Sequence, residues 1–123
     1  MNQEFLSCDW GTTSFRLRRV AGPDRTLVRE IREQAGVKSL YEEAMRSGAE
    51  IEVARANVFA HFLHAKLEAL LAGEKTPQRK LPLVISGMAS SSVGWRELPY
   101  AKTPFPLDGC RLRSQELNWS NPE

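Results

Sequence analysis

The sequence is poor in the features that mark secreted and membrane proteins. Its 123 residues include two cysteines, Cys8 and Cys110, which are far apart and form no C-x-x-C pair. The N-terminus also lacks the basic and apolar segments of a signal peptide. These observations predict free, inert thiols in a reducing cytoplasm. No apolar run approaches the roughly 20 residues that a membrane span requires, so we expect no membrane partner.

An excess of charge is missing as well. The chain has 17 Lys+Arg and 15 Asp+Glu, a net charge of +2, which is too small to predict a nucleic-acid partner. The phosphate motifs G-x-x-x-x-G-K-[ST] and G-x-G-x-x-G and the metal motif H-E-x-x-H are absent. His61 and His64 are therefore expected to be solvated or core-edge residues. At 41% hydrophobic residues, the chain has enough apolar content for a core.

The first third of the chain predicts an antiparallel meander. Residues 4–9, 15–20 and 26–31 are apolar or alternating stretches, separated by turn residues. Alternation places Arg16 and Arg18 on one solvated face of this sheet.

The next segment has a helical period. Capping-box patterns at residues 39–42 and 47–50 predict a short helix to about residue 46 and a longer helix that ends at Gly73. The apolar face of the longer helix is Ile51, Ala54, Val58, Phe62, Ala65 and Leu70, widened by Phe59, Leu63 and Leu67.

The last third predicts one more strand among loops. Residues 74–80 are a solvated loop, residues 81–86 a buried strand, and residues 96–109, with three prolines, an extended loop. We expect one folded domain over residues 1–110, and either a polar tail or the start of a missing continuation over residues 111–123.

Residues 9–13 (D-W-G-T-T) join the first two predicted strands and have the chemistry of a phosphate site. Gly11 allows a tight turn, and the amides and hydroxyls of Thr12 and Thr13 can donate to an anion. Asp9, at the end of its strand, can hold Mg²⁺ through water. A plain hairpin is the alternative, because turns favour these residues in any case.

Three segments resemble one family. Residues 9–16 (D-W-G-T-T-S-F-R), 34–37 (Q-A-G-V) and 86–100 (S-G-M-A-S-S-S-V-G-W-R-E-L-P-Y) are similar to motifs of the 2-dehydro-3-deoxygalactonokinases. These are sugar-acid kinases of the actin/Hsp70/hexokinase superfamily. The third segment is long and unusual, which makes the resemblance specific, although Ser90 replaces the family's usual glycine. The resemblance implies an α/β fold: a ribonuclease-H-like lobe with a three-strand antiparallel meander, helices and a further parallel strand.

The resemblance also implies a reaction, the ATP-dependent phosphorylation of 2-dehydro-3-deoxy-D-galactonate at its C6 hydroxyl. In that reading Asp9 orients Mg²⁺, and Gly11, Thr12 and Thr13 contact the ATP phosphates. Arg16 is favoured over Arg96 as the partner of the substrate carboxylate. The rest of the sugar-acid site would be the loop residues Ser86, Gly87, Met88, Ser90, Ser91, Gly94 and Trp95.

Family members are well over twice as long as this chain, so the resemblance covers an N-terminal lobe. The catalytic base is then expected outside the chain, because Asp108 is a poor candidate. Two alternatives remain. One is a catalytically incomplete half-kinase that binds a sugar acid or a partner and forms a homodimer through its exposed lobe face.

The other alternative is a ribonuclease-H-like nuclease with several carboxylates at two metals. It is disfavoured because residues 11–13 would have no role in it and the charge is near neutral. Three aromatic residues could stack on a sugar ring, but we expect each of them to anchor the core or a loop instead: Trp10, Trp95 and Tyr100.

Overall fold

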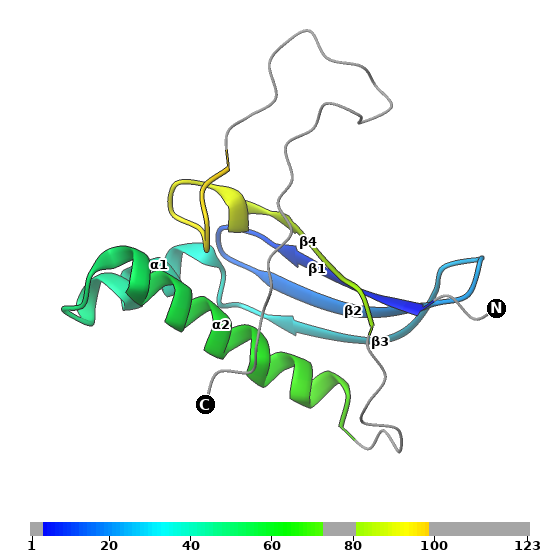
Figure 1. Ribbon diagram of the computed structural model, residues 1–123. Helices are drawn as coiled ribbons and strands as arrows, with labels where there is room; N and C mark the ends of the chain where they lie inside the picture. Colours follow the sequence, from blue (N-terminus) through cyan, green and yellow to red (C-terminus); the bar gives the residue numbers. More distant parts are fainter. Residues whose placement is uncertain (1–3, 73–80, 99–123) are drawn as a thin grey trace, which may run out of the picture.

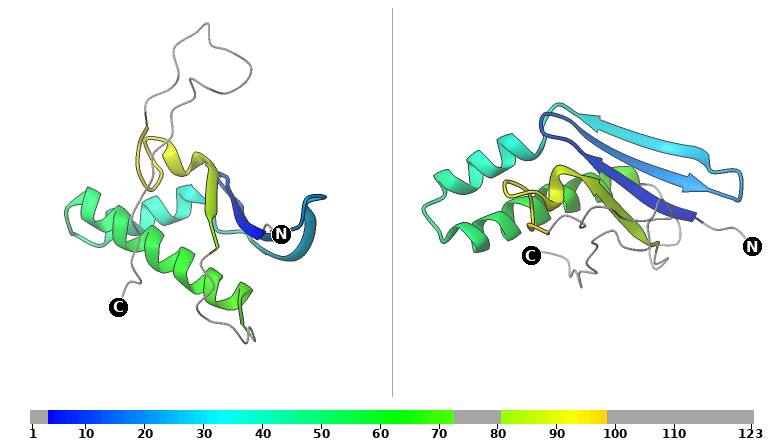
Figure 2. Two further views of the ribbon diagram at one scale, coloured as in Figure 1. Left: turned by 45° about the vertical axis from the view of Figure 1, so that its right-hand side comes forward. Right: turned by 90° about the horizontal axis from the view of Figure 1, so that it is seen from above.

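The computed structural model describes residues 4–72 and 81–98, which form one sheet with two helices. The elements are β1 (Glu4–Trp10), β2 (Phe15–Ala21), β3 (Thr26–Glu33), α1 (Val37–Arg46), α2 (Ile51–Leu70), β4 (Leu83–Gly87) and the 3₁₀ turn η1 (Met88–Ser90). The strand order is β3-β2-β1-β4. Both helices lie on the same side of the sheet (Figures 1 and 2).

The predicted strand arrangement is confirmed. β1, β2 and β3 form an antiparallel meander, and β4 pairs with β1 in parallel. β3 runs two residues beyond the predicted end because Glu33 pairs with Phe15 at the start of β2. The observed architecture is therefore a mixed α/β sheet covered by helices on one face.

The core lies between the sheet and α2. Side chains alternate along β1 and β2, so every second residue points toward the helices. The buried residues on this side are Leu6, Cys8, Trp10, Phe15 and Leu17. From α2 the buried large side chains are Phe59, Leu63, Leu67 and Leu70, whereas the predicted face residue Ala65 is exposed. Phe59, Leu63 and Leu67, which were predicted only to widen the apolar face of this helix, are therefore at the centre of its buried face. The reason is that α2 turns these residues toward β2 and β3.

Both predicted helix starts were wrong. α1 begins at Val37 after an N-cap glycine, Gly36, and Ser39 lies inside the helix with its hydroxyl donating to the Gly36 carbonyl at 3.0 Å. Ser47 caps the end of α1 instead of starting α2, whose N-cap is Glu50. No side-chain cap is required on α1, because the Val37 amide donates to the Gly11 carbonyl at 2.9 Å.

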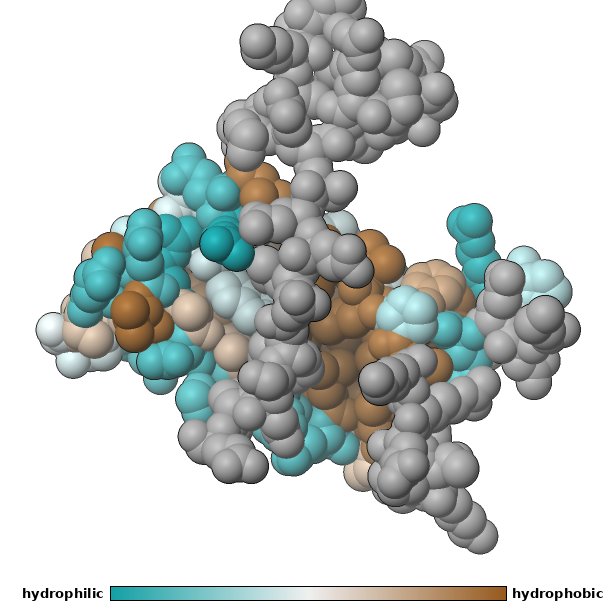
Figure 3. Space-filling model, in the orientation of Figure 1, coloured by the Kyte–Doolittle hydropathy of each residue, from teal (hydrophilic) through white to brown (hydrophobic). Residues whose placement is uncertain are grey.

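The buried-strand prediction was also wrong, because within the described residues β4 lies at an edge of the sheet. It pairs with β1 only, and its Val84 side chain is 57% exposed. The helices cover just one face, so a β-branched apolar run is half-exposed here. The space-filling view shows apolar surface over the region of β4, beside α2 (Figure 3).

Several expectations fall outside the described residues. α2 ends at Leu70 with Leu71 as its C-cap, before the predicted cap. The predictions for the following residues lie outside the described part of the chain: Gly73, residues 74–80, residues 99–109 including Asp108, Cys110 and the tail 111–123. Within the described residues, none of the helices is long and apolar enough to cross a membrane.

The Cys8 thiol is an inert core group, as predicted. Its side chain is fully buried on the helix side of β1. Burial, and then the neighbouring Asp9 carboxylate, raise the pKa of the Cys8 thiol from 9.0 to about 12. The reactive thiolate is therefore scarce at neutral pH.

Gly36→Ala tests the contact between α1 and the hairpin turn. A Cβ at position 36 would lie less than 3.0 Å from the Thr12 carbonyl, so backbone must move. We expect thermal or denaturant unfolding to show a loss of roughly 2–3 kcal/mol.

The matched control is Gly48→Asn. Gly48 has φ +78° with open space around it, and asparagine tolerates that conformation. We expect this change to cost less than about 1 kcal/mol. Equal losses in the two variants would contradict a steric role for Gly36.

Candidate functional site

Three segments that are distant in sequence meet at one end of the sheet. They are the hairpin turn (residues 11–14), the N-terminus of α1, and the glycine loop (residues 87–95) that follows β4. β1 and β4 are parallel, and Trp10 is paired with Gly87 at their shared carboxyl end. Figure 1 shows these segments gathered beside the end of α1. The carboxyl end of parallel strands is the usual position for ligand sites in α/β sheets.

Glycines make this meeting possible because backbones touch there. A Cβ at Gly36 would lie within 3.0 Å of the Thr12 carbonyl, and one at Gly94 within 3.0 Å of the Ala89 carbonyl. Gly87 has φ +96°, and a Cβ there would press on the Trp10 carbonyl. The glycines of the second and third motif segments therefore have a packing role in this structure.

The hairpin turn offers donors at its tip but not at its first residue. The Gly11 amide donates to the Ser14 carbonyl at 2.8 Å, so it closes the turn. Thr12 and Thr13 are exposed, and within the described part of the chain their amides have no hydrogen-bond partner. Two successive amides and two hydroxyls can therefore donate to an anion at this turn.

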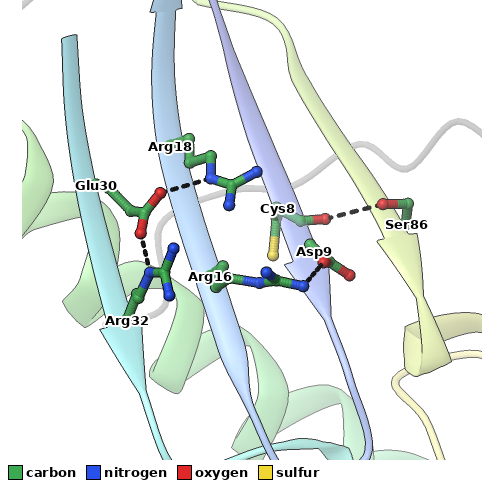
Figure 4. A network of polar contacts seen from close by, with 7 residues as sticks. All are labelled: Cys8, Asp9, Arg16, Arg18, Glu30, Arg32 and Ser86. Atoms are coloured by element: carbon green, nitrogen blue, oxygen red, sulfur yellow. Dashed lines mark hydrogen bonds and ion pairs between the residues drawn. The ribbon is translucent and has the colours of Figure 1, made fainter. Parts of the chain in front are cut away.

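Asp9 and Arg16 form a cross-strand ion pair on the face of the sheet opposite the helices. They are direct partners in the β1–β2 register, and each side chain is 39% exposed (Figure 4). Ser86 is opposite Asp9 on β4, and its hydroxyl donates to the Cys8 carbonyl at 3.4 Å. The structure thus brings three of the predicted site residues together, with Arg16 paired to the carboxylate.

A second charged group extends along the same face. Glu30 accepts hydrogen bonds from Arg32 and from Arg18, the latter at 2.6 Å (Figure 4). These bonds, the one from Arg32 first, lower the pKa of Glu30 below its ordinary value. Arg16 and Arg18 do share the predicted face, and both are paired with carboxylates there. Arg19 is on the buried side and pairs with Glu4.

The glycine loop is closed by its own backbone. The Gly94 amide donates to the Ser91 carbonyl at 3.0 Å, and the Arg96 amide to the Ala89 carbonyl at 3.1 Å. The Ser91 hydroxyl donates to the Met88 carbonyl at 2.7 Å, whereas Ser90 is exposed. Of the two hydroxyls predicted to contact a sugar acid, only that of Ser90 is uncommitted within the described residues.

The two tryptophans among the described residues differ in how accessible they are to a ligand. Trp10 is fully buried, and its ring is 5.0 Å from that of Phe15 and 5.2 Å from that of Phe59. Trp95 is half-buried, with its ring 6.2 Å from that of Trp10 in a T-shaped contact. The core reading of Trp10 is confirmed, and Trp95 anchors the glycine loop to that core.

Sequence reasoning missed Arg55. From α2 its Nε donates to the Gly94 carbonyl at 2.7 Å, and its Nη2 to the Ser91 carbonyl at 3.4 Å. Its guanidinium also lies 5.6 Å from the centre of the Tyr41 ring on α1. The available signal was an arginine on the edge of an apolar helix face, between Ala54 and Val58.

Metal ligands are sparse in the described residues. Residues 4–72 and 81–98 contain no group of three or more His, Cys, Asp or Glu side chains that could hold a metal. His61 is bonded to the Asn57 carbonyl, and His64 lies 3.0 Å from Glu68 on the same helix. Asp9 fits one kind of metal, because Mg²⁺ takes one or two carboxylates together with water and phosphate oxygens.

Comparison with known proteins supports the motif resemblance over most of the chain. A family model described as 2-keto-3-deoxy-galactonokinase matches residues 9–120. The chain belongs to the 2-keto-3-deoxy-galactonokinase family. The match contains the hairpin turn, the α1 N-terminus and the glycine loop.

Two relatives illustrate the similarity to this family. A curated protein of Rhizobium meliloti (strain 1021), named as a candidate 2-dehydro-3-deoxygalactonokinase, is 32% identical over 103 residues. That match covers 84% of this chain and 27% of the relative. A crystal structure of a candidate 2-dehydro-3-deoxygalactonokinase from Sinorhizobium meliloti is 30% identical with a TM-score of 0.54. It covers 85% of this chain and 28% of the solved chain, so the chain spans about a quarter of the length of either relative.

Glu30→Gln tests the charged group on the open face of the sheet. The folded pKa of Glu30 is below its ordinary value of 4.5, so its ionised form is stabilised by folding. The stabilisation by the Glu30 carboxylate is therefore fully present when the pH is above its ordinary pKa. It is lost as the pH falls through the lowered pKa of the folded state. We expect wild type to melt higher than Glu30→Gln at neutral pH, with the gap closing in acid.

Glu42→Gln is the control, because this exposed carboxylate on α1 has no partner within the described residues. Thermal unfolding between about pH 3 and pH 7 follows both variants. A difference in melting temperature between wild type and Glu30→Gln that stays constant across this pH range would contradict the role of the Glu30 charge.

Proposed function

We propose that the chain forms the phosphate-binding, ribonuclease-H-like lobe of a sugar-acid kinase. The enzyme would transfer the γ-phosphate of ATP to the C6 hydroxyl of 2-dehydro-3-deoxy-D-galactonate. Family membership supports the substrate class. The proposal rests on one observation: Asp9, the Thr12 and Thr13 amides, which have no partner within the described residues, and the glycine loop lie at the same end of the sheet.

The hairpin turn fits an ATP phosphate group. The Thr12 and Thr13 amides and hydroxyls would donate to phosphate oxygens, while the Gly11 amide keeps the turn closed. Asp9 supplies the carboxylate that would hold Mg²⁺. When bound, Mg²⁺ neutralises charge on the transferring phosphate group, and the remaining catalysis is positioning and electrostatic stabilisation.

Arg16 is placed to change partners. Its ion pair with Asp9 is 39% exposed on both sides, and such pairs contribute roughly 0–1 kcal/mol. A cation and an anionic ligand at the site can therefore separate the pair at small cost. Arg16 would then bind either the substrate carboxylate or a phosphate, and Arg96, also exposed, is the second candidate for the carboxylate.

The glycine loop would contact the sugar acid. Ser86 and Ser90 are exposed hydroxyls at the end of β4, and Met88 is exposed beside them. Gly87 and Gly94 shape the backbone that carries them, Ser91 braces it, and Trp95 ties it to the core. The catalytic base is assigned to a part of the enzyme beyond the described residues, since the relatives are much longer.

Asp9→Asn tests the metal role in an enzyme of the relatives' length that carries this segment. We expect turnover of 2-dehydro-3-deoxy-D-galactonate with Mg-ATP to fall by about 10²–10³ or more, since an electrostatic group at the reacting phosphate is lost. The melting temperature should stay close to that of wild type because the Asp9–Arg16 pair is exposed.

Asp24→Asn is the matched control. This exposed aspartate lies in the turn between β2 and β3, at the opposite end of the sheet, and accepts only from Thr26 within the described residues. It should leave turnover unchanged. Full activity in Asp9→Asn would remove the metal role from Asp9. Sugar-acid binding without any phosphate transfer in the wild type would favour a binding module instead.

A further inference from the structure

One side chain of α2 contacts both the glycine loop and α1. Arg55 donates to the carbonyls of Gly94 and Ser91 in the glycine loop, at 2.7 and 3.4 Å. The same guanidinium lies over the Tyr41 ring of α1 at 5.6 Å. Both carbonyls belong to residues that the proposed function places in the sugar-acid site.

The bonded carbonyls are at the closing point of the loop. The Ser91 carbonyl also accepts the Gly94 amide at 3.0 Å, so it uses both of its acceptor positions. Gly94 is buried against the carbonyls of Met88 and Ala89, which leaves no room for a side chain. Arg55 therefore holds the loop where the chain turns back on itself.

Arginine suits this position for chemical reasons. Its planar guanidinium presents donors in a fixed fork, and a charged donor forms stronger bonds to carbonyls than a neutral one. The Tyr41 ring restricts the plane of the guanidinium through a cation–π contact. Lysine would keep the charge and one donor but lose the fork and the stacking.

We propose that Arg55 is a positioning residue that holds the glycine loop in one conformation for sugar-acid binding. It acts through the loop backbone, with Nε and Nη2 committed to carbonyls, and leaves the substrate carboxylate to Arg16 or Arg96. The choice of ligand rests on the proposed function, while the ordering of the loop rests on the contacts of Arg55 alone.

The first measurement is amide hydrogen exchange on the protein and its Arg55→Ala and Arg55→Lys variants. In Arg55→Ala the amides of Gly94, Arg96 and Leu98 should exchange at least tenfold faster, because their loop bonds open. The amides of β1 and β2 should keep their wild-type rates. Arg55→Lys should fall between wild type and Arg55→Ala.

The control is Arg29→Ala. Arg29 donates from β3 to the Ala72 carbonyl at 3.3 Å, an arginine–carbonyl bond of the same kind away from the loop. It should leave the loop amides unchanged. Unchanged loop amides in Arg55→Ala, or equal acceleration throughout the sheet, would overturn the proposal.

The second measurement is the affinity for 2-dehydro-3-deoxy-D-galactonate by calorimetry, in an enzyme of the relatives' length that carries this segment. Arg55→Ala should weaken binding at least tenfold, Arg55→Lys less, and Arg29→Ala not at all. Faster loop exchange with unchanged affinity would overturn the positioning role. A wild type that does not bind this sugar acid would instead refute the proposed substrate, and hydrogen exchange would then decide whether Arg55 orders the loop.

Discussion

The buried ring of Trp10 is the contact on which the rest of the structure depends. It touches aromatic rings from β2, from α2 and from the glycine loop, which are Phe15, Phe59, Phe62 and Trp95. Burying a large aromatic ring is among the strongest contributions that one residue makes to a small core. Because side chains alternate along a strand, a buried Trp10 places Asp9 on the opposite, open face of the sheet. The core and the candidate site are therefore fixed by adjacent residues.

Backbone contacts explain why the family motifs contain glycine where they do. At the N-terminus of α1, the first two amides donate to the carbonyls of Gly11 and Thr12, at 2.9 and 3.0 Å. That helix end, which elsewhere binds anions, is used here to hold the hairpin turn. The Thr12 and Thr13 amides at the tip of the turn have no hydrogen-bond partner within the described residues. Gly36 permits this arrangement, since any side chain there would collide with the turn.

Some parts of the fold could be predicted from the sequence and others could not. The three strands of the meander were predicted because alternation and turn residues are local signals, as at Gly22. The helix starts were not, because the groups that satisfy the α1 amides come from a turn more than twenty residues earlier. The apolar run of β4 was read as buried because composition alone does not show which sheet face the helices cover. Arg55 was missed for a related reason, since its partners lie 36 and 39 residues away.

The sequence by itself determined the meander, the glycine-bearing motifs, the inert character of Cys8 and the family. These follow from local periodicity and from residue patterns that need no partner. Only the tertiary structure decided that Asp9 and Arg16 form a pair, that the Trp10 ring joins β2, α2 and the glycine loop, and that Arg55 bonds that loop. Each of these depends on how two distant segments pack, and the free energy of a contact exists only once both segments are in place.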